Sequence, residues 1–429
     1  MPSPAHRTPR PSLRALSAAL LILTALAAAS PDIPPRARAA APAPIALGAS
    51  MTAPSRGLYA PCDTAPMDDF AAQTGRRPAI ALWYQPWGGY GPNPQWADFP
   101  ERCMDNAYAR GAVVLTTWEP WDGNPSNPAY KLTTITRGDF DPYIRRYADD
   151  AKVWGHPFYL RFAHEMNGNW YPWGTGPHNP EGNTPADYVA AWRHVHDLFV
   201  QEGAANVRWV WSPNTLSSNS PQATATYPGD AYVDWLGIDA YNVGASKGWD
   251  GWQSLADLLE PAYTAITHLS NKPLMIAETA TTEHGGDKAA WIRRGLLLDA
   301  PARLPRVRAV VWFDKNRDWR VDSSPASLAA FRTVVASPLY HGNVDVDNPS
   351  SRVVALPNHL TRASTTSTVT SPTLPGTPTA PALPPPAPTP TAPALPADVL
   401  SLPGSVVSVS ITSGTPTAPV VPTGVPLAP

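Results

Sequence analysis

Residues 157–162 read PFYLRF, residues 185–202 read PADYVAAWRHVHDLFVQE, and residues 207–211 read VRWVW. The first and third runs are short and mostly apolar, which is typical of strands buried on both faces. The middle run is longer and amphipathic, and Thr184 followed by Pro185 is a good start for a helix. A strand, a helix and a second strand in this order predict two parallel strands joined by a crossover helix.

The same alternation continues in both directions along the chain. Eight strands are predicted, at 45–49, 79–84, 112–117, 157–162, 207–211, 235–239, 273–277 and 307–313. Seven helices are predicted, at 64–74, 101–110, 142–154, 185–202, 254–270, 288–299 and 325–335. The sixth helix of the series is poorly defined. Eight strand units over about 300 residues match an α/β fold of the (β/α)8 TIM barrel type better than an open sheet.

Residues 1–39 are predicted to be a signal peptide and pro-segment. Basic residues within the first 14 positions precede an uncharged run at 15–29 that is mostly Ala and Leu, which is the pattern of a secretory signal. Fifteen residues are too few for a stable membrane span, which needs about 20. Cleavage after Ala29 or at the triplet 37–39 both fit, and a retained membrane anchor is the alternative. We therefore expect a secreted, extracellular protein with no integral membrane span in its mature form.

Residues 345–429 are predicted to be a low-complexity tail rich in Pro, Thr, Ser and Ala. Residues 361–429 hold 17 of the 54 prolines and only two charged residues, Arg362 and Asp398. This composition cannot bury enough apolar surface to offset chain entropy, so we expect a disordered, extended linker. All 17 tryptophans lie between Trp83 and Trp319. The folded domain is therefore expected at 40–344.

The charge balance and the cysteines exclude several classes of function. The formal net charge is −2 with both signs interspersed, so no basic stripe exists to bind a nucleic acid. Cys62 and Cys103 are too few for a zinc site. Export makes a disulfide between them plausible, with two free thiols as the alternative. The sequence His164-Glu165 begins like the metalloprotease motif H-E-x-x-H, but Gly168 takes the place of the second histidine. We expect no metal and no cofactor.

Aromatic and polar residues gather where the predicted strands end, which is the face on which barrel enzymes build active sites. Aromatic faces stack on sugar rings while amides, histidines and acids bind hydroxyl groups, so this mixture suits a carbohydrate. The residues expected to bind substrate are Trp83, Trp118, His164, Asn167, Trp170, Trp173, Tyr241 and Trp312. The alternative for any tryptophan is a place in the core. We favour the core for those on helix or strand bodies, which are Trp154, Trp192, Trp209, Trp235 and Trp291.

Glu165 and Glu278 stand out because they follow the fourth and the seventh predicted strands. Hydrolysis of a glycosidic bond needs one carboxylic acid to protonate the leaving oxygen and one carboxylate to attack or to activate water. The ends of these strands can converge across the mouth of a barrel, so we predict that both glutamates are catalytic. Arg161 is predicted to pair either with Glu278 or with another acid. Glu119 is expected to bind a distal sugar, and Asp239 is expected to be structural.

Residues 161–173, RFAHEMNGNWYPW, resemble the signature of glycoside hydrolase family 26, whose best-known members are endo-β-1,4-mannanases. The resemblance extends over about residues 45–340, through the runs at 239–242, 277–279, 312–313 and 318–320. It implies a retaining (β/α)8 hydrolase in which Glu165 is the acid/base and Glu278 is the nucleophile.

The same resemblance implies roles for the neighbouring side chains. His164 would hydrogen-bond near the nucleophile or to sugar hydroxyls, and Tyr241 would support the nucleophile. Trp170 and Trp312 would stack on the cleaved sugar. The acid/base must stay protonated near neutral pH, and the negative charge of the nucleophile would supply part of the required rise in its pKa.

Together these observations predict a secreted, retaining, endo-acting glycoside hydrolase. It would cleave β-1,4-mannosidic bonds of mannan-type polysaccharides by a two-glutamate double displacement. The alternatives are a β-1,3-1,4-glucanase or β-1,3-xylanase of the same family, or a non-catalytic polysaccharide-binding protein. The many tryptophans favour a long cleft and endo attack, although loops could close one end and make the action exo. The expected partner is a polysaccharide, and the expected assembly is a monomer.

Overall fold

The computed structural model describes residues 43–51, 62–88, 96–179, 181–215, 220–247, 251–343 and 354–355. The predicted signal segment at 1–39 lies outside these ranges, as does the predicted tail at 345–429 except for two residues.

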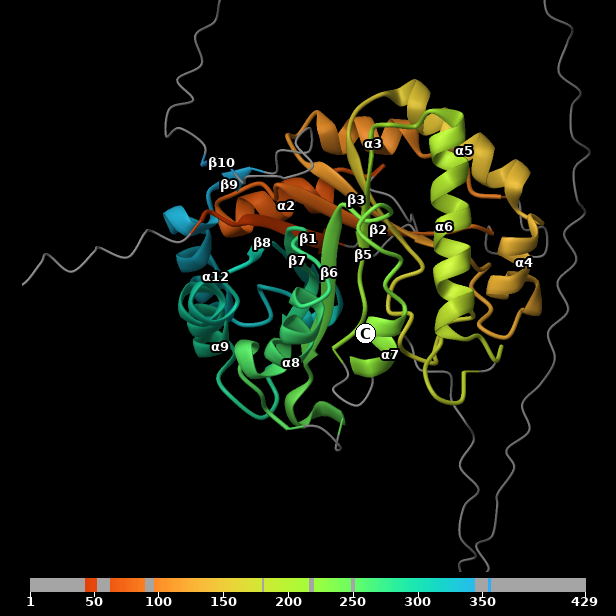
Figure 1. The fold of residues 1–429 in the computed structure, drawn as a ribbon. Helices are drawn as coiled ribbons and strands as arrows, with labels where there is room; N and C mark the ends of the chain where they lie inside the picture. The colour runs from red at the N-terminus through yellow and green to blue at the C-terminus, as the bar shows by residue number, and fades with distance from the viewer. Residues whose placement is uncertain are drawn as a thin grey trace, which may run out of the picture. The chain divides into compact units, whose positions relative to one another are not determined.

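Eight parallel strands form the centre of the fold (Figure 1). They are β1 (Ala46–Met51), β2 (Ile80–Pro86), β3 (Val113–Glu119), β4 (Phe158–Phe162), β5 (Val207–Trp211), β6 (Trp235–Asn242), β7 (Leu274–Thr281) and β8 (Val307–Asp314). Each strand pairs with the next in chain order, and β1 pairs with β8 from Ala46↔Ala309 to Met51↔Asp314, which closes the sheet. The predicted (β/α)8 TIM barrel is therefore confirmed.

Six of the eight strands run further toward their carboxyl ends than the sequence predicts. The prediction ends each strand where the apolar run ends. In the structure, polar residues beyond that point continue the backbone pairing as long as the neighbouring strand also continues. In the pairing of β6 with β7, for example, the register extends to Asn242↔Thr281. As a result Glu119, Tyr241 and Glu278 lie on strands rather than in loops, which fixes their backbones.

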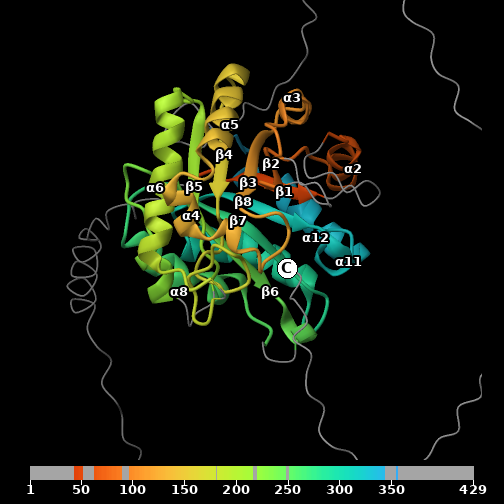
Figure 2. The same ribbon diagram turned by 90° about the vertical axis from the view of Figure 1, so that its right-hand side faces the viewer.

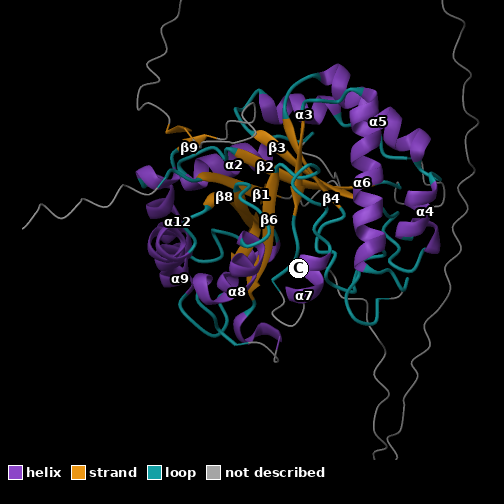
Figure 3. Cartoon of the chain, in the orientation of Figure 1, coloured by secondary structure: helices purple, strands orange, loops and turns teal. Residues whose placement is uncertain are grey.

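Helices surround the strands (Figures 2 and 3). They are α2 (Ala65–Thr74), α3 (Glu101–Tyr108), α4 (Leu132–Arg137), α5 (Asp141–Trp154), α6 (Pro185–Glu202), α7 (Ser220–Ala225), α8 (Leu255–Thr267), α9 (Lys288–Arg294), α10 (Ala300–Arg303), α11 (Asn316–Trp319) and α12 (Pro325–Ala336). The helix predicted at 288–299 ends earlier, because its second half is a π turn at Gly295–Asp299. The short α7, which follows β5, was not predicted.

The helix starts show how local sequence sets these boundaries. Thr184 accepts a hydrogen bond from the backbone of Asp187, whose side chain in turn accepts from the Thr184 backbone, so a full capping box begins α6. Ser324 caps α12, because its side chain accepts a hydrogen bond from the backbone of Ser327. Asp141 does not cap α5, because the helix already includes it and its carboxylate pairs with His194 on α6 instead.

The core has two layers, because side chains of a strand alternate between the barrel interior and the helices. The interior holds one cluster of apolar side chains, including Ile80, Leu82, Leu115, Tyr159, Val210, Trp235, Met275 and Val311. A larger cluster fills the space between strands and helices, and it contains four of the five tryptophans expected in the core, Trp154, Trp192, Trp209 and Trp291. The fifth, Trp235, lies in the interior cluster, so the core expectation is confirmed for all five.

Two features lie outside the eight repeats. Cys62 and Cys103 form a disulfide that joins the segment before α2 to α3. The short strands β9 (Gly342–Asn343) and β10 (Val354–Ala355) pair antiparallel, and β9 also pairs with β1, so two residues of the predicted tail extend the sheet. Among the residues that the structure describes, no helix combines the length and the apolar character of a membrane span.

Candidate active site

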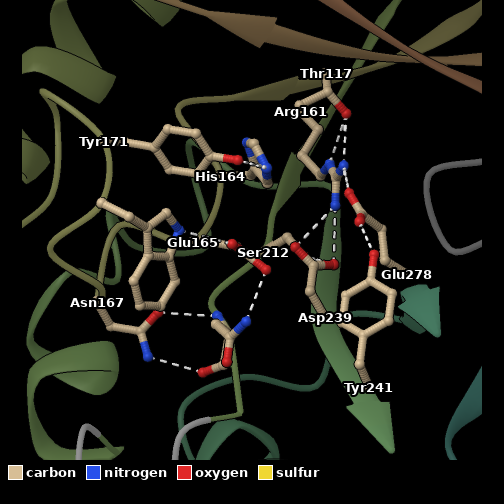
Figure 4. A network of polar contacts seen from close by, with 12 residues as sticks. Thr117, Arg161, His164, Glu165, Asn167, Tyr171, Ser212, Asp239, Tyr241 and Glu278 are labelled. Carbon is tan, nitrogen blue, oxygen red and sulfur yellow. Dashed lines mark hydrogen bonds and ion pairs between the residues drawn. The ribbon is translucent and has the colours of Figure 1, made fainter. Parts of the chain in front are cut away.

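Arg161 stands at the centre of the polar network at the mouth of the barrel (Figure 4). It is fully buried in β4, two residues after Tyr159 and therefore on the same interior face. Its Nη1 donates to both carboxylate oxygens of Asp239, at 2.8 and 2.9 Å. Its Nε and Nη2 donate to Thr117 Oγ1, at 3.0 and 2.6 Å, and Nη2 also donates to Glu278 Oε1. The sequence left open whether Arg161 pairs with Glu278 or with another acid, and in the structure it pairs with both Glu278 and Asp239.

Asp239 completes this buried ion pair. Its Oδ1 accepts a further hydrogen bond of 2.9 Å from Ser212 Oγ at the end of β5. The potential metal-binding group found among the described residues is His164, Asp239 and Glu278, whose ligand atoms lie within 4.8 Å of one another. The guanidinium of Arg161 already bonds to both carboxylates, so a cation occupies this place. The donor set therefore suits an ion-pair network better than a metal ion.

Glu278 lies inside the barrel because the sheet is irregular around it. Met275 and Ala277 face the interior, and strict alternation would turn Glu278 toward the helices. The register of β7 shifts against β8 between Ile276 and Thr279, and such an irregularity re-aims a side chain. The carboxylate consequently meets Arg161 from within the barrel.

Tyr241 on β6 supplies the second donor to Glu278. Its hydroxyl donates to Oε2, while Arg161 donates to Oε1, so both carboxylate oxygens are held. The ring of Tyr241 packs edge-on against Phe313 and Trp319, at centroid distances of 5.3 and 5.4 Å. The carboxylate therefore has one fixed orientation.

Glu165 follows β4 and is buried on the same side of the barrel. Its Oε2 accepts from Trp170 Nε1 at 2.9 Å and its Oε1 accepts from Asn214 Nδ2 at 2.7 Å. Burial, and next the negative charge of Glu278, raise the pKa of the Glu165 carboxyl to about 7, against the opposing effect of these donors and of Arg161. A carboxyl with this pKa is suited to give a proton at neutral pH and later take it back.

The backbone around Glu165 is strained. Ala163 has φ 46° and Glu165 has φ 52°, in the left-handed region that side chains other than glycine rarely adopt. Each such residue costs about 1 kcal/mol or more. The turn is held by hydrogen bonds from Ala163 N to Trp118 O at 3.1 Å and from Glu165 N to Ser212 O at 2.8 Å. Strain of this kind, held in place by neighbouring strands, often marks a functional site.

Asn167 was predicted to bind substrate, but the structure gives it a different task. It is fully buried, and its side chain bonds to the backbone of Asn214 in both directions, at 2.7 and 2.9 Å. Because the side chain of Asn214 in turn holds Glu165, Asn167 positions the acid through a second amide. Asn214 itself was missed as a site residue, although it follows the fifth predicted strand and the strand-end rule would have found it.

His164 lies beside Asp239 and Glu278, and its ring is neutral. Burial and the charge of Arg161 hold the pKa of His164 well below its ordinary value. Its Nε2 lies 3.3 Å from the Tyr171 hydroxyl, and its Nδ1 is buried with no hydrogen-bond partner among the described residues. Trp173 donates to the backbone carbonyl of His164 at 2.7 Å and stacks on Tyr171 at 4.3 Å. Trp173 is fully buried and supports His164, and its contact with substrate stays a prediction.

Three other tryptophans predicted to bind substrate lie elsewhere. Trp83, Trp118 and Trp312 are at most 3% exposed and belong to the layer between strands and helices. The Trp118 indole donates to the Tyr143 hydroxyl at 3.2 Å, and Trp312 packs against Phe331 of α12. Alternation along each strand turns these rings outward, toward the helices, so the structure places them in the core and their contact with substrate stays a prediction.

Trp170 is the predicted tryptophan that the structure brings to the site. It is half-buried and bonds to Glu165. Gly168 permits this position, because a Cβ added there would lie 2.4 Å from the Trp170 ring. The half-buried Trp319, which packs on Tyr241, is a further aromatic residue of the site that the residue-by-residue prediction did not include.

Glu119, expected to bind a distal sugar, is buried at the end of β3. Its Oε2 accepts from Trp121 Nε1 at 3.2 Å. Burial raises the pKa of Glu119 to about 8, while Trp121 and the positive charges of Arg161 and Lys315 act in the opposite direction. Among the described residues, Glu119 therefore adds a fourth buried carboxyl to those of Glu165, Glu278 and Asp239.

Comparison with known proteins agrees with this geometry. Residues 142–293 match the family model of glycosyl hydrolase family 26. The chain is 40% identical over 237 residues to Endoglucanase H of Acetivibrio thermocellus, an alignment that covers 54% of this chain and 25% of that protein. It is 32% identical over 170 residues to the mannan endo-1,4-beta-mannosidase A and B of Caldalkalibacillus mannanilyticus, covering 35% of this chain and 32% of that protein. The chain thus spans about a quarter to a third of the length of these relatives.

The fold is also similar to solved structures. The catalytic domain of the family 26 endo-beta-1,4-mannanase from Bacillus sp. JAMB-750 superposes with a TM-score of 0.54 at 19% identity, covering 69% of this chain and 86% of that one. At this identity the likeness supports the barrel fold.

Proposed function

Because residues 142–293 match the model of glycosyl hydrolase family 26, we propose that the chain is a member of that family and hydrolyses β-linked polysaccharides with retention of configuration. The observation that carries the proposal is the pair of buried carboxyls, Glu165 and Glu278, at one barrel mouth. One is held by neutral donors and has a raised pKa, and the other is held by a guanidinium and a phenol. Such a difference of environment assigns the acid and the nucleophile.

In the first step Glu278 attacks the anomeric carbon while Glu165 gives its proton to the leaving oxygen. The bond from Glu278 to the sugar forms as the glycosidic bond breaks, and the leaving chain departs with the proton of Glu165. Arg161 and Tyr241 keep the attacking carboxylate in one orientation through the hydrogen bonds described above. This positioning lowers the entropic part of the barrier.

In the second step Glu165 acts as a base. Once Glu278 carries the sugar it has lost its negative charge, which is one of the two causes that raise the pKa of Glu165. The pKa of Glu165 then falls, so its carboxylate can take a proton from water as the water attacks the anomeric carbon. Glu278 leaves as a carboxylate, and the free enzyme is restored.

We propose β-1,4-mannan as the first substrate to be tested, which agrees with the relative named a mannan endo-1,4-beta-mannosidase. A second candidate, a β-glucan, rests on the relative named Endoglucanase H, which has the higher identity over the longer stretch. Mannose and glucose differ in the orientation of the hydroxyl at carbon 2. The choice between them therefore depends on the side chains that surround that hydroxyl.

The same proposal includes secretion. The sequence begins with the pattern of a secretory signal, and the disulfide between Cys62 and Cys103 is a bond that persists in oxidising compartments. Extracellular action also suits a polymer substrate that cannot enter a cell.

The test is the release of reducing sugar by the purified full chain from β-mannan, mixed-linkage β-glucan and β-1,3-xylan. Glu165→Gln and Glu278→Gln serve as variants that keep the size of each side chain. We expect hydrolysis of one polymer, with loss of at least about 1,000-fold in kcat for Glu278→Gln. The anomer released first, followed by proton NMR, should have the configuration of the substrate. Full activity of both variants would refute the mechanism, and binding without hydrolysis would favour a carbohydrate-binding protein.

A further inference from the structure

Lys315 follows β8 directly and brings a positive charge to the barrel mouth. Its Nζ lies 4.0 Å from the centroid of the Tyr84 ring and 5.4 Å from that of Phe313. A cation over an aromatic face at these distances is attracted by the ring. Lys315 therefore has a preferred position in the described structure.

That position is close to the proposed nucleophile, because the two rings that Lys315 contacts also contact the donors of Glu278. The Arg161 guanidinium lies 5.9 Å from the centroid of the Tyr84 ring, and Tyr241 packs on Phe313 at 5.3 Å. The charge of Glu278 acts on both Lys315 and Tyr84, and the charge of Glu119 also acts on Lys315. Burial lowers the pKa of Lys315 to about 8, and both carboxylates oppose that fall. The ammonium is thus partly removed from water beside the reacting centre.

The hydrogen-bonding capacity of this ammonium is unused within the described part of the chain. Among those residues, the Lys315 ammonium takes part in no hydrogen bond and no ion pair, and its cation–π contacts are with the two rings. The acids nearby have other donors, because Glu278 is held by Arg161 and Tyr241. By contrast the buried Lys288 donates to two backbone carbonyls, as a buried amine ordinarily does.

From this geometry we propose that Lys315 binds substrate, donating a hydrogen bond to a hydroxyl oxygen of the sugar that is joined to Glu278 during the reaction. The inference rests on the proposed function and adds a specificity residue to it. The Lys315 ammonium has three N–H donors, and its contacts with the ring faces leave these donors free to bond to a ligand. A sugar hydroxyl oxygen is a neutral acceptor that can enter the mouth of the barrel. One hydrogen bond to a charged donor contributes about a 10- to 100-fold change in affinity.

The kinetic test uses Lys315→Met, which keeps the chain length and removes the donor, and Lys315→Arg, which keeps a charged donor. Lys152→Met is the matched control, because Lys152 pairs with Asp149 in the last turn of α5. That turn leads into the amino end of β4, at the end of the barrel opposite to the mouth. We expect Lys315→Met to lose 10- to 100-fold in kcat/KM on the polysaccharide that the wild type cleaves and on an aryl β-glycoside of the same sugar. Lys315→Arg should recover part of the loss, and Lys152→Met should match the wild type.

A second measurement does not depend on catalysis or on the folding of a Lys315 variant. Reductive methylation of lysines in the Glu278→Gln protein, with and without manno- or mixed-linkage gluco-tetrasaccharide, is followed by mass spectrometry of peptides. Protection of Lys315 by a tetrasaccharide, with no protection of Lys152, is the expected result. Lys315→Met kinetics within twofold of the wild type, or hydrolysis by the wild type without protection of Lys315, would overturn the inference and leave the proposed function standing. If the wild type hydrolyses none of the polymers, the proposed function is refuted, and protection of Lys315 would then still support its role in binding. Absence of both hydrolysis and protection would refute the proposed function and the role of Lys315 together.

Discussion

Asn214 Nδ2 lies 2.7 Å from Glu165 Oε1, so a residue beyond the end of β5 controls the carboxyl that follows β4. This hydrogen bond lowers the pKa of Glu165, against the larger effect of burial. Asn214→Ala removes the donor, so the pKa of Glu165 should rise above about 7. The alkaline limb of the profile of kcat/KM against pH should then move to higher pH, while kcat falls by about 10-fold from lost orientation.

The measurement is the initial rate between pH 4 and pH 10 for Asn214→Ala and the wild type. Asn214→Asp adds a negative charge and should move the alkaline limb further in the same direction. A limb that stays in place, or moves to lower pH, would contradict the assignment of Glu165 as the acid.

The buried carboxyls make folding stability depend on pH. The folded-state pKa of Glu165 is about 7 and that of Glu119 about 8, both raised from 4.5. Between pH 4.5 and 8 the unfolded chain binds fewer protons than the folded one, so the free energy of unfolding falls as pH rises. Glu165→Gln removes one of these titrating groups. The difference between the Tm of the variant and the Tm of the wild type should therefore increase by roughly 3–6 °C from pH 4 to pH 8, in favour of the variant.

Differential scanning calorimetry of both proteins at several pH values checks this prediction. Comparing the two slopes against pH cancels any constant effect of the substitution. Parallel slopes would mean that Glu165 ionises in the folded protein as readily as in the unfolded chain.

Gly168 is expected to be intolerant of a side chain because of Trp170. A Cβ at Gly168 would lie 2.4–2.5 Å from the Trp170 ring, which must then move. Gly168→Ala should therefore break the hydrogen bond from Trp170 to Glu165 and lower kcat by about 10-fold or more. Gly251→Ala is the control, since no atom of the described residues lies within 4 Å of an added Cβ there. Kinetics and near-ultraviolet circular dichroism of both variants provide the measurement, and equal kinetics would exclude Trp170 as a positioning group.

Lys288 is expected to hold the segment that carries Trp319. Its Nζ donates to the carbonyls of Asp318 and Arg320 at 2.6 and 2.9 Å, on either side of Trp319. Trp312 Nε1 donates to the Trp319 carbonyl itself at 2.9 Å. Lys288→Met removes the donor of both carbonyls, which are part-buried, and should reduce the free energy of unfolding by about 1–3 kcal/mol.

Because Trp319 packs on Tyr241, the same variant should also raise KM or lower kcat. Urea unfolding and steady-state kinetics measure the two effects, with Lys152→Met as a control for loss of a lysine. A stability equal to that of the wild type would show that the carbonyls find other partners.

The sequence by itself predicted the barrel, because its signals are local. Apolar runs such as 207–211, the capping residue Thr184 and the spacing of strands act over a few residues, and tertiary contacts did not override them. The position of Glu165 and Glu278 at strand ends was readable for the same reason. The catalytic roles of these two glutamates were inferred from the order of the motifs along the chain, and they stay predictions.

The tertiary structure decided which way each side chain points. Trp312 and Glu278 both stand at strand ends, yet one turns to the helices and the other into the barrel. The difference comes from the pairing of β7 with its neighbours, whose register shifts near Glu278. Because side chains on a strand alternate with period two, one such shift exchanges inside for outside, and only the closed sheet specifies where it occurs.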